Sequence, residues 1–208
     1  MVHFSEAVNH GNPLAFIDAA VPGHRRLNIA VIGDTAAEDP GLRPLISGPH
    51  TFQLGMFMCL PDEGPAWHLH EYVEAFIPLS GRWRFRCAAS EERLDDPDGD
   101  YELGPWDVIS LPAGTWRSFE NLGGEPAWCL GVLDAHEQFA FKDPQWPACV
   151  VSAAARLGLA ADDSGKLVES PESARLAEEL RQVLGEAAAR TGPPPAGSAA
   201  RRRGERFS

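Results

Sequence analysis

The chain has 208 residues, of which 44% are hydrophobic and 23% charged, and this length and composition predict one soluble domain with short extensions. Its formal net charge of -12 repels phosphate backbones, so we expect a small-molecule ligand and no nucleic-acid partner. No apolar run approaches the about 18 residues that a membrane helix needs, and the N-terminus lacks the pattern of a secretory signal. We therefore expect a cytoplasmic protein without membrane contact.

Four cysteines are scattered along the chain: Cys59, Cys87, Cys129 and Cys149. No two of them form a C-x-x-C pair, so neither a zinc-finger cage nor a redox dithiol is indicated. We expect reduced and mostly buried thiols.

Residues 1–25 carry glycines and prolines between short apolar patches, which predicts an irregular N-terminal arm with one turn of helix at most. From Arg26 onward, short apolar stretches alternate with Gly, Pro and Asp clusters, and several stretches show the period-two alternation of a half-buried strand. Many short strands with closely spaced turns are typical of an antiparallel barrel or sandwich. The prediction is an all-β barrel over residues 26–150.

After the barrel, residues 151–190 are predicted to form a helical extension. Glu172 to Arg190 contains strong helix formers, and its apolar residues recur at helical spacing. Residues 191–208 are rich in Pro, Gly, Ala and Arg, which predicts a disordered tail. The triple Arg201 to Arg203 is interpreted as a solvated end rather than an interaction motif.

The segment from Gly64 to Gly81 carries the chemistry. Side chains alternate along a strand, so His68, His70 and Glu74 share one face and converge on a common point. Two neutral imidazoles and one carboxylate suit Fe(II), Mn(II), Ni(II), Cu(II) or Zn(II) better than Ca(II) or Mg(II). The spacing therefore predicts a transition-metal site.

These residues resemble the first motif of the cupin superfamily, H-x-H, three or four residues, E, six residues, G. The stretch Pro112-Ala-Gly114, Arg117 and Asn121 resembles the second motif, P-x-G, two residues, H, three residues, N. The resemblance extends over roughly 26–134 and implies a double-stranded β-helix, or jelly-roll barrel. It departs at Arg117, where the family has its fourth ligand, a histidine, and at Trp106, where the second motif usually starts with glycine.

Two interpretations of Arg117 stay open. In the first, His68, His70 and Glu74 hold the metal with open positions, and Arg117 grips an anionic substrate group in a bidentate contact. In the second, Arg117 pairs with Glu74 and its charge takes the place of the metal in a binding pocket without catalysis. His136 is a further candidate ligand, although an exposed loop histidine is the simpler interpretation.

Aromatic residues around the motifs are candidate pocket walls. Phe76 and Phe119 share the parity of Glu74 and Arg117, and Trp83 lies in the same tryptophan-rich region. Tyr72 also has ligand parity, and its hydroxyl is a candidate proton or hydrogen-bond donor. We expect Arg117 and Tyr72 to be catalytic and the three aromatic side chains to contact the substrate.

The resemblance and the predicted site together favour a non-haem Fe(II) oxygenase acting on a small anionic or aromatic metabolite, with Mn(II), Ni(II) or Zn(II) as alternative ions. A metal-dependent isomerase or lyase and a non-catalytic metabolite-binding or sugar-binding cupin are the alternatives. Unpaired sheet edges and the apolar stripe of the predicted helix suggest a homodimer.

Overall fold

The computed structural model describes residues 1–10, 21, 23–33, 43–48, 50–134, 144–156, 158–161, 167–168 and 170–191. In this part of the chain, no helix is long and apolar enough to cross a membrane. All four cysteines are free, as expected; Cys59 and Cys129 are buried and Cys149 is exposed.

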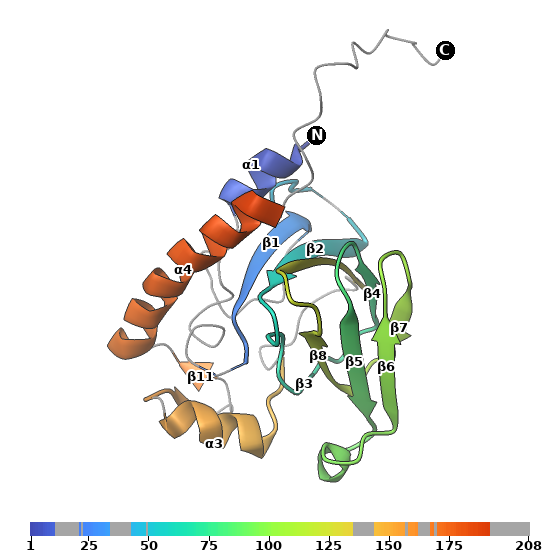
Figure 1. Cartoon of the computed structure of the whole chain (residues 1–208). Helices are drawn as coiled ribbons and strands as arrows, with labels where there is room; N and C mark the ends of the chain where they lie inside the picture. The colour runs from blue at the N-terminus through green and yellow to red at the C-terminus, as the bar shows by residue number, and fades with distance from the viewer. Residues whose placement is uncertain are drawn as a thin grey trace, which may run out of the picture.

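Two antiparallel sheets build the barrel (Figure 1). The first sheet has the order β1 (Arg26–Ile32), β2 (Phe52–Cys59), β9 (Ala127–Asp134), β4 (Glu74–Pro78) and β7 (Ile109–Leu111). The second has the order β3 (His68–Leu69), β8 (Trp116–Asn121), β5 (Trp83–Ala88) and β6 (Gly99–Leu103). From β2 on, the chain crosses repeatedly between the two sheets, which is the connectivity of a jelly roll. The predicted all-β barrel is confirmed.

The apolar stretches that follow Arg26 form β1, β2, β4, β5, β7 and β9, whereas β6 begins inside an acidic run, Glu91 to Glu102. Of that run, the 3-10 helix η1 (Glu91–Arg93) and the turn after it are the exposed tip. β6 has only Gly99 and Leu103 buried, so its apolar content is too low to indicate a strand.

Aromatic side chains fill the space between the sheets. Phe57 contacts Phe76, Trp83 and Phe119 with ring centroids 6.2, 5.7 and 5.3 Å away. Phe85 packs on Phe119 at 5.2 Å in a stacked arrangement. These rings form a buried core that fills the barrel interior beside the residues of the two motifs.

Helices cover the outer face of the first sheet at β1, β2 and β9. The helix α1 (Phe4–Asn9) lies in the predicted N-terminal arm, and α4 (Pro171–Thr191) confirms the predicted C-terminal helix. The short helix α3 (Ala148–Arg156) begins within the range expected for the barrel, and β10 (Ala160–Ala161) pairs with β11 (Leu167–Val168). The predicted tail beyond Thr191 lies outside the described residues.

The apolar stripe of α4 packs on its own chain. Leu180 and Leu184 are buried against Leu27, Ile29 and Met58, whereas Val183 is 49% exposed. The sheet therefore covers the stripe for which the sequence suggested a second subunit.

Replacing Leu184 with alanine tests this packing. The side chain is fully buried, so Leu184→Ala should lower the free energy of unfolding by about 2–5 kcal/mol. Val183→Ala, on the exposed side of the same helix, should change it by less than about 0.5 kcal/mol. Urea unfolding followed by circular dichroism measures both, and equal effects would contradict the docking of α4.

Candidate metal centre

Three predicted ligands meet inside the barrel. His68 lies in β3, His70 follows that strand, and Glu74 is the first residue of β4 in the opposite sheet. One ligand atom from each lies within 4.8 Å of the other two, and all three residues are buried. Among the described residues, this is the group of histidine, cysteine and acidic side chains with the geometry to hold a metal ion.

Both imidazole rings are oriented through Nδ1. His68 Nδ1 lies 2.7 Å from the carbonyl oxygen of Ala66 and therefore donates to it. His70 Nδ1 lies 2.8 Å from the hydroxyl of Tyr72, whose ring stacks on the imidazole at 4.6 Å. The proton of His68 is therefore on Nδ1 and its lone pair on Nε2, and His70 Nε2 faces Glu74 Oε2 at 3.9 Å. Metal-binding histidines are usually held in this way.

The electrostatic surroundings keep His68 neutral. Burial lowers its pKa well below the usual value, and the neighbouring His70 and the Arg117 charge lower it further, against the opposing effect of the Ala66 carbonyl. Neutral imidazole is the form that binds a metal ion. The donor set and its protonation therefore fit a divalent metal ion.

Arg117 lies beside the cluster in β8, directly across from His68 in the neighbouring strand. Its side chain is completely buried, and Nη1 donates to Glu74 Oε2 at 3.1 Å. Nη2 donates to the carbonyl of Pro112 at 2.9 Å and Nε to that of Thr115 at 3.2 Å. All three guanidinium nitrogens thus bind acceptors of the chain itself, and the oxygen that faces His70 also accepts from Arg117.

Trp146 and His24, two residues that the sequence did not suggest, complete the surroundings of the cluster. Leu69 and Gln145 exchange backbone hydrogen bonds of 3.0 Å, and this bridge brings Trp146 to 5.9 Å from the His68 ring. Trp146 also contacts His24 at 6.1 Å, and His24 Nε2 accepts from the backbone N–H of Ala66 at 3.1 Å. Neither residue has a ligand-like spacing to the motif, so no local pattern could reveal them.

The predicted pocket residues lie at different distances from the cluster. Phe119 is 6.0 Å from His68, and Phe76 is 4.7 Å from Phe119. Trp83 packs on Phe57 and Phe85, and its Nε1 donates to the Ser80 carbonyl at 2.8 Å. Substrate contact by these three residues stays a prediction, and His136 lies outside the described residues.

Comparison with solved structures finds cupin proteins. The cupin domain of Schizosaccharomyces pombe Cnp3 is 12% identical over 53% of this chain and 65% of its own, with a TM-score of 0.39. A cupin-2 domain from Rhodospirillum rubrum is 16% identical over 64% of this chain and 76% of its own, with a TM-score of 0.43. A chain from the DMSP lyase structures RdDddP and RnDddQII is 18% identical, covers 59% of this chain and has a TM-score of 0.44.

This chain spans less than two thirds of the Cnp3 chain and 52% of the DMSP lyase chain. No family model and no curated protein matches the sequence. The strand order, together with the first motif on β3 and β4 and the second on β8, decides the fold. The chain has the cupin fold. Within this fold, the two histidines and Glu74 form a candidate divalent-metal site.

The buried His24 gives the protein an expected dependence of stability on pH. Burial, followed by the Arg26 charge, lowers its pKa from the usual 6.5 to about 3. Between these values the unfolded chain binds a proton that the folded chain excludes, so stability falls as the pH falls through this window. The slope that one such group contributes is at most about 1.4 kcal/mol per pH unit.

His24→Gln keeps a hydrogen-bond acceptor for Ala66 without a titrating ring. Urea unfolding at pH 7, 5.5 and 4.5 should therefore show a smaller acid loss in the variant than in the parent protein, by about 1 kcal/mol per pH unit. Parallel pH profiles would contradict the neutral, buried state of His24.

Proposed function

We propose that the chain is a metal-dependent cupin enzyme, most simply a non-haem Fe(II) oxygenase acting on a small anionic or aromatic metabolite. The observation that carries this proposal is the pair of histidines, each held through Nδ1, beside a carboxylate within 4.8 Å. Two histidines and one carboxylate are the donor set of non-haem Fe(II) oxygenases. A ferrous ion held by His68, His70 and Glu74 would supply the redox chemistry that activates O2.

The chain's own residues would orient the reactants. Arg117 holds the Glu74 carboxylate, and the Ala66 carbonyl and Tyr72 hydroxyl hold the two imidazoles. Phe119 and Trp146 place aromatic surface against His68, where it would exclude water and favour a flat substrate. The contacts of Arg117 favour positioning of Glu74 over the substrate grip that the sequence suggests.

A metal-dependent lyase or isomerase is the second candidate. The hydroxyl of Tyr72 lies 2.8 Å from the His70 ring, so a phenolic proton donor or acceptor stands next to the proposed metal. Such a reaction would consume no oxygen. The same Tyr72 would act as acid or base here, whereas in the oxygenase it would hold His70.

A binding protein without catalysis is the third candidate, and the Glu74–Arg117 ion pair favours it. A guanidinium on the carboxylate oxygen competes with a metal ion for the same lone pairs.

We also propose a cytoplasmic homodimer. Since α4 is covered by its own sheet, this proposal depends on the sheet edges alone.

Metal analysis of the full chain is the first test. Protein produced with added iron should contain about one equivalent of divalent metal, because three protein ligands bind a transition ion tightly. His68→Gln should lose this metal, whereas His10→Gln, which changes an exposed histidine, should keep it. Elemental analysis by plasma mass spectrometry measures both.

Equal metal content in His68→Gln and His10→Gln would contradict the proposed centre. An oxygen electrode then separates the candidates, with the metal-loaded protein and a panel of aromatic carboxylates. Oxygen uptake supports the oxygenase, and metal-dependent turnover without uptake supports the lyase or isomerase. Absence of metal from the parent protein supports the binding protein.

Arg117→Gln tests the competition between guanidinium and metal. Removing a positive charge 3.1 Å from Glu74 Oε2 should tighten Zn(II) binding by about tenfold. Arg175→Gln makes the same change of net charge on the exposed face of α4 and should leave affinity unchanged. Competition with a chromogenic chelator measures the constants, and circular dichroism checks folding. Unchanged or weaker binding in Arg117→Gln would mean that Arg117 does not compete with the ion.

A further inference from the structure

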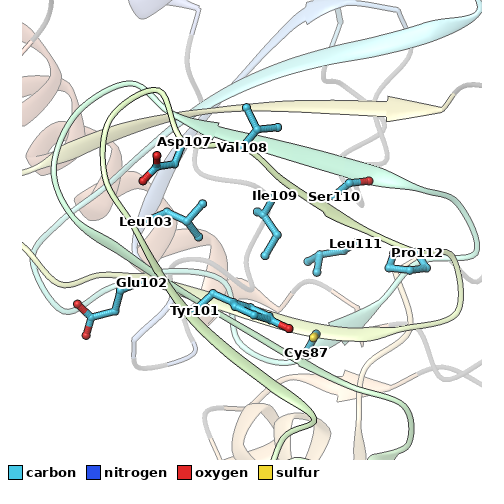
Figure 2. Close-up of a pocket in the computed structure, with 10 residues that line it drawn as sticks. All are labelled: Cys87, Tyr101, Glu102, Leu103, Asp107, Val108, Ile109, Ser110, Leu111 and Pro112. Carbon is cyan, nitrogen blue, oxygen red and sulfur yellow. The ribbon is translucent and has the colours of Figure 1, made fainter.

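A pocket opens at the edge of the barrel where β6, the outermost strand of one sheet, lies next to β7, the outermost strand of the other. β6 ends the second sheet and β7 ends the first, and the chain turns between them at 104–108. The pocket between these strands has a volume of about 530 Å³, within the range of small-molecule sites. Figure 2 shows its lining: Cys87, Tyr101, Glu102, Leu103, Asp107, Val108, Ile109, Ser110, Leu111 and Pro112.

The lining exposes apolar surface that a lone domain normally buries. Tyr101 is 49% exposed and Val108 is 64% exposed, although Tyr101 has the same parity as the inward-facing Leu103. At the inner end, the Tyr101 ring and hydroxyl and the Cys87 sulfur all lie within 3 Å of the position that a Cβ on Gly99 would take. The missing side chain of Gly99 therefore leaves room for the tyrosine ring beside the thiol.

The pocket reaches the back of the Glu74–Arg117 ion pair. Cys87 pairs with Arg117 across β5 and β8, and Leu111 pairs with Glu74 across β7 and β4. The carbonyl of Pro112, another lining residue, accepts from Arg117 Nη2. The pocket thus adjoins the metal centre from the side opposite His68, and the ion pair separates the two.

The charges of the pocket favour a cation. None of its lining residues is basic, and two are acidic. Glu102 is balanced by Arg82 and Arg84 at 3.7 and 3.9 Å, whereas Asp107 Oδ2 accepts from the backbone N–H of Gly104. Burial raises the pKa of Cys87, and the negative charge of Asp98 raises it more than Arg117 lowers it. The thiol end of the pocket therefore favours the neutral form of Cys87.

We propose that this pocket binds a small organic cation with an apolar, ring-sized body. The apolar side chains of Leu103, Ile109 and Leu111 would contact the body. The exposed face of Tyr101 and the carboxylate of Asp107 would attract the positive charge. Its positive charge distinguishes this ligand from an anionic substrate at the metal centre.

Protection of Cys87 tests the proposal with defined probes. The metal-free full chain is treated with iodoacetamide, and peptide mass spectrometry follows modification of Cys87, with exposed Cys149 as an internal control. Benzyltrimethylammonium should slow modification of Cys87 by the factor 1 + [L]/Kd, about tenfold at roughly ten times Kd, and leave Cys149 unchanged. Phenylmethanesulfonate, with the same ring and the opposite charge, should protect neither.

A positive charge introduced at the mouth provides the matched variant. Val108→Arg should abolish protection by benzyltrimethylammonium, whereas Val183→Arg, which changes another exposed valine, on α4, should preserve it. Protection by both probes or by neither, protection of Cys149 in parallel, or unchanged protection in Val108→Arg would overturn the proposal. A Cys87 that iodoacetamide does not modify would overturn it too, because the pocket would then be closed.

Discussion

The ion pair between Glu74 and Arg117 is the constraint on which the interior depends. Glu74 belongs to one sheet and Arg117 to the other, so their contact joins the two layers in the buried part of the barrel. Removal of one partner of a buried pair leaves an uncompensated charge and typically costs about 3–5 kcal/mol. The sheets are therefore held in the arrangement that brings Glu74 opposite the two histidines of β3.

Much of this arrangement could be predicted because it depends on local rules. Period-two alternation puts His68, His70 and Glu74 on the inner face, and the motif glycines and asparagine meet steric and hydrogen-bonding needs. A Cβ on Gly64 would lie 2.0 Å from the carbonyl oxygen of Phe119. Asn121, fully buried, donates to the carbonyls of Cys59 and Glu125 and accepts from Gly123. These residues are recognisable because the backbone leaves no alternative at their positions.

The remainder depends on contacts between distant segments. Trp146 reaches His68 only because Gln145 pairs with Leu69, more than 70 residues away in the sequence. The partner of Arg117 could not be decided from the sequence, since parity gives the face of a side chain and not the acceptor that it finds. The sequence did not reveal the pocket between β6 and β7 because β6 carries few apolar residues. An edge strand is also defined by the neighbouring strand that it lacks, which no local sequence pattern records.

The two departures from the second motif lie on either side of that pocket. Trp106 has a φ of 74°, a left-handed conformation that favours glycine, and it is held by donation of its N–H to the Pro78 carbonyl at 2.8 Å. It directly precedes Asp107 and Val108 at the pocket mouth, and Arg117 lies behind Cys87 at the inner end. The barrel thus keeps Gly64 and Asn121, where steric and hydrogen-bonding needs leave no alternative, and departs from the motif at Trp106 and Arg117, on either side of the pocket. Any chemistry particular to this protein is therefore expected along the wall from Trp106 to Arg117.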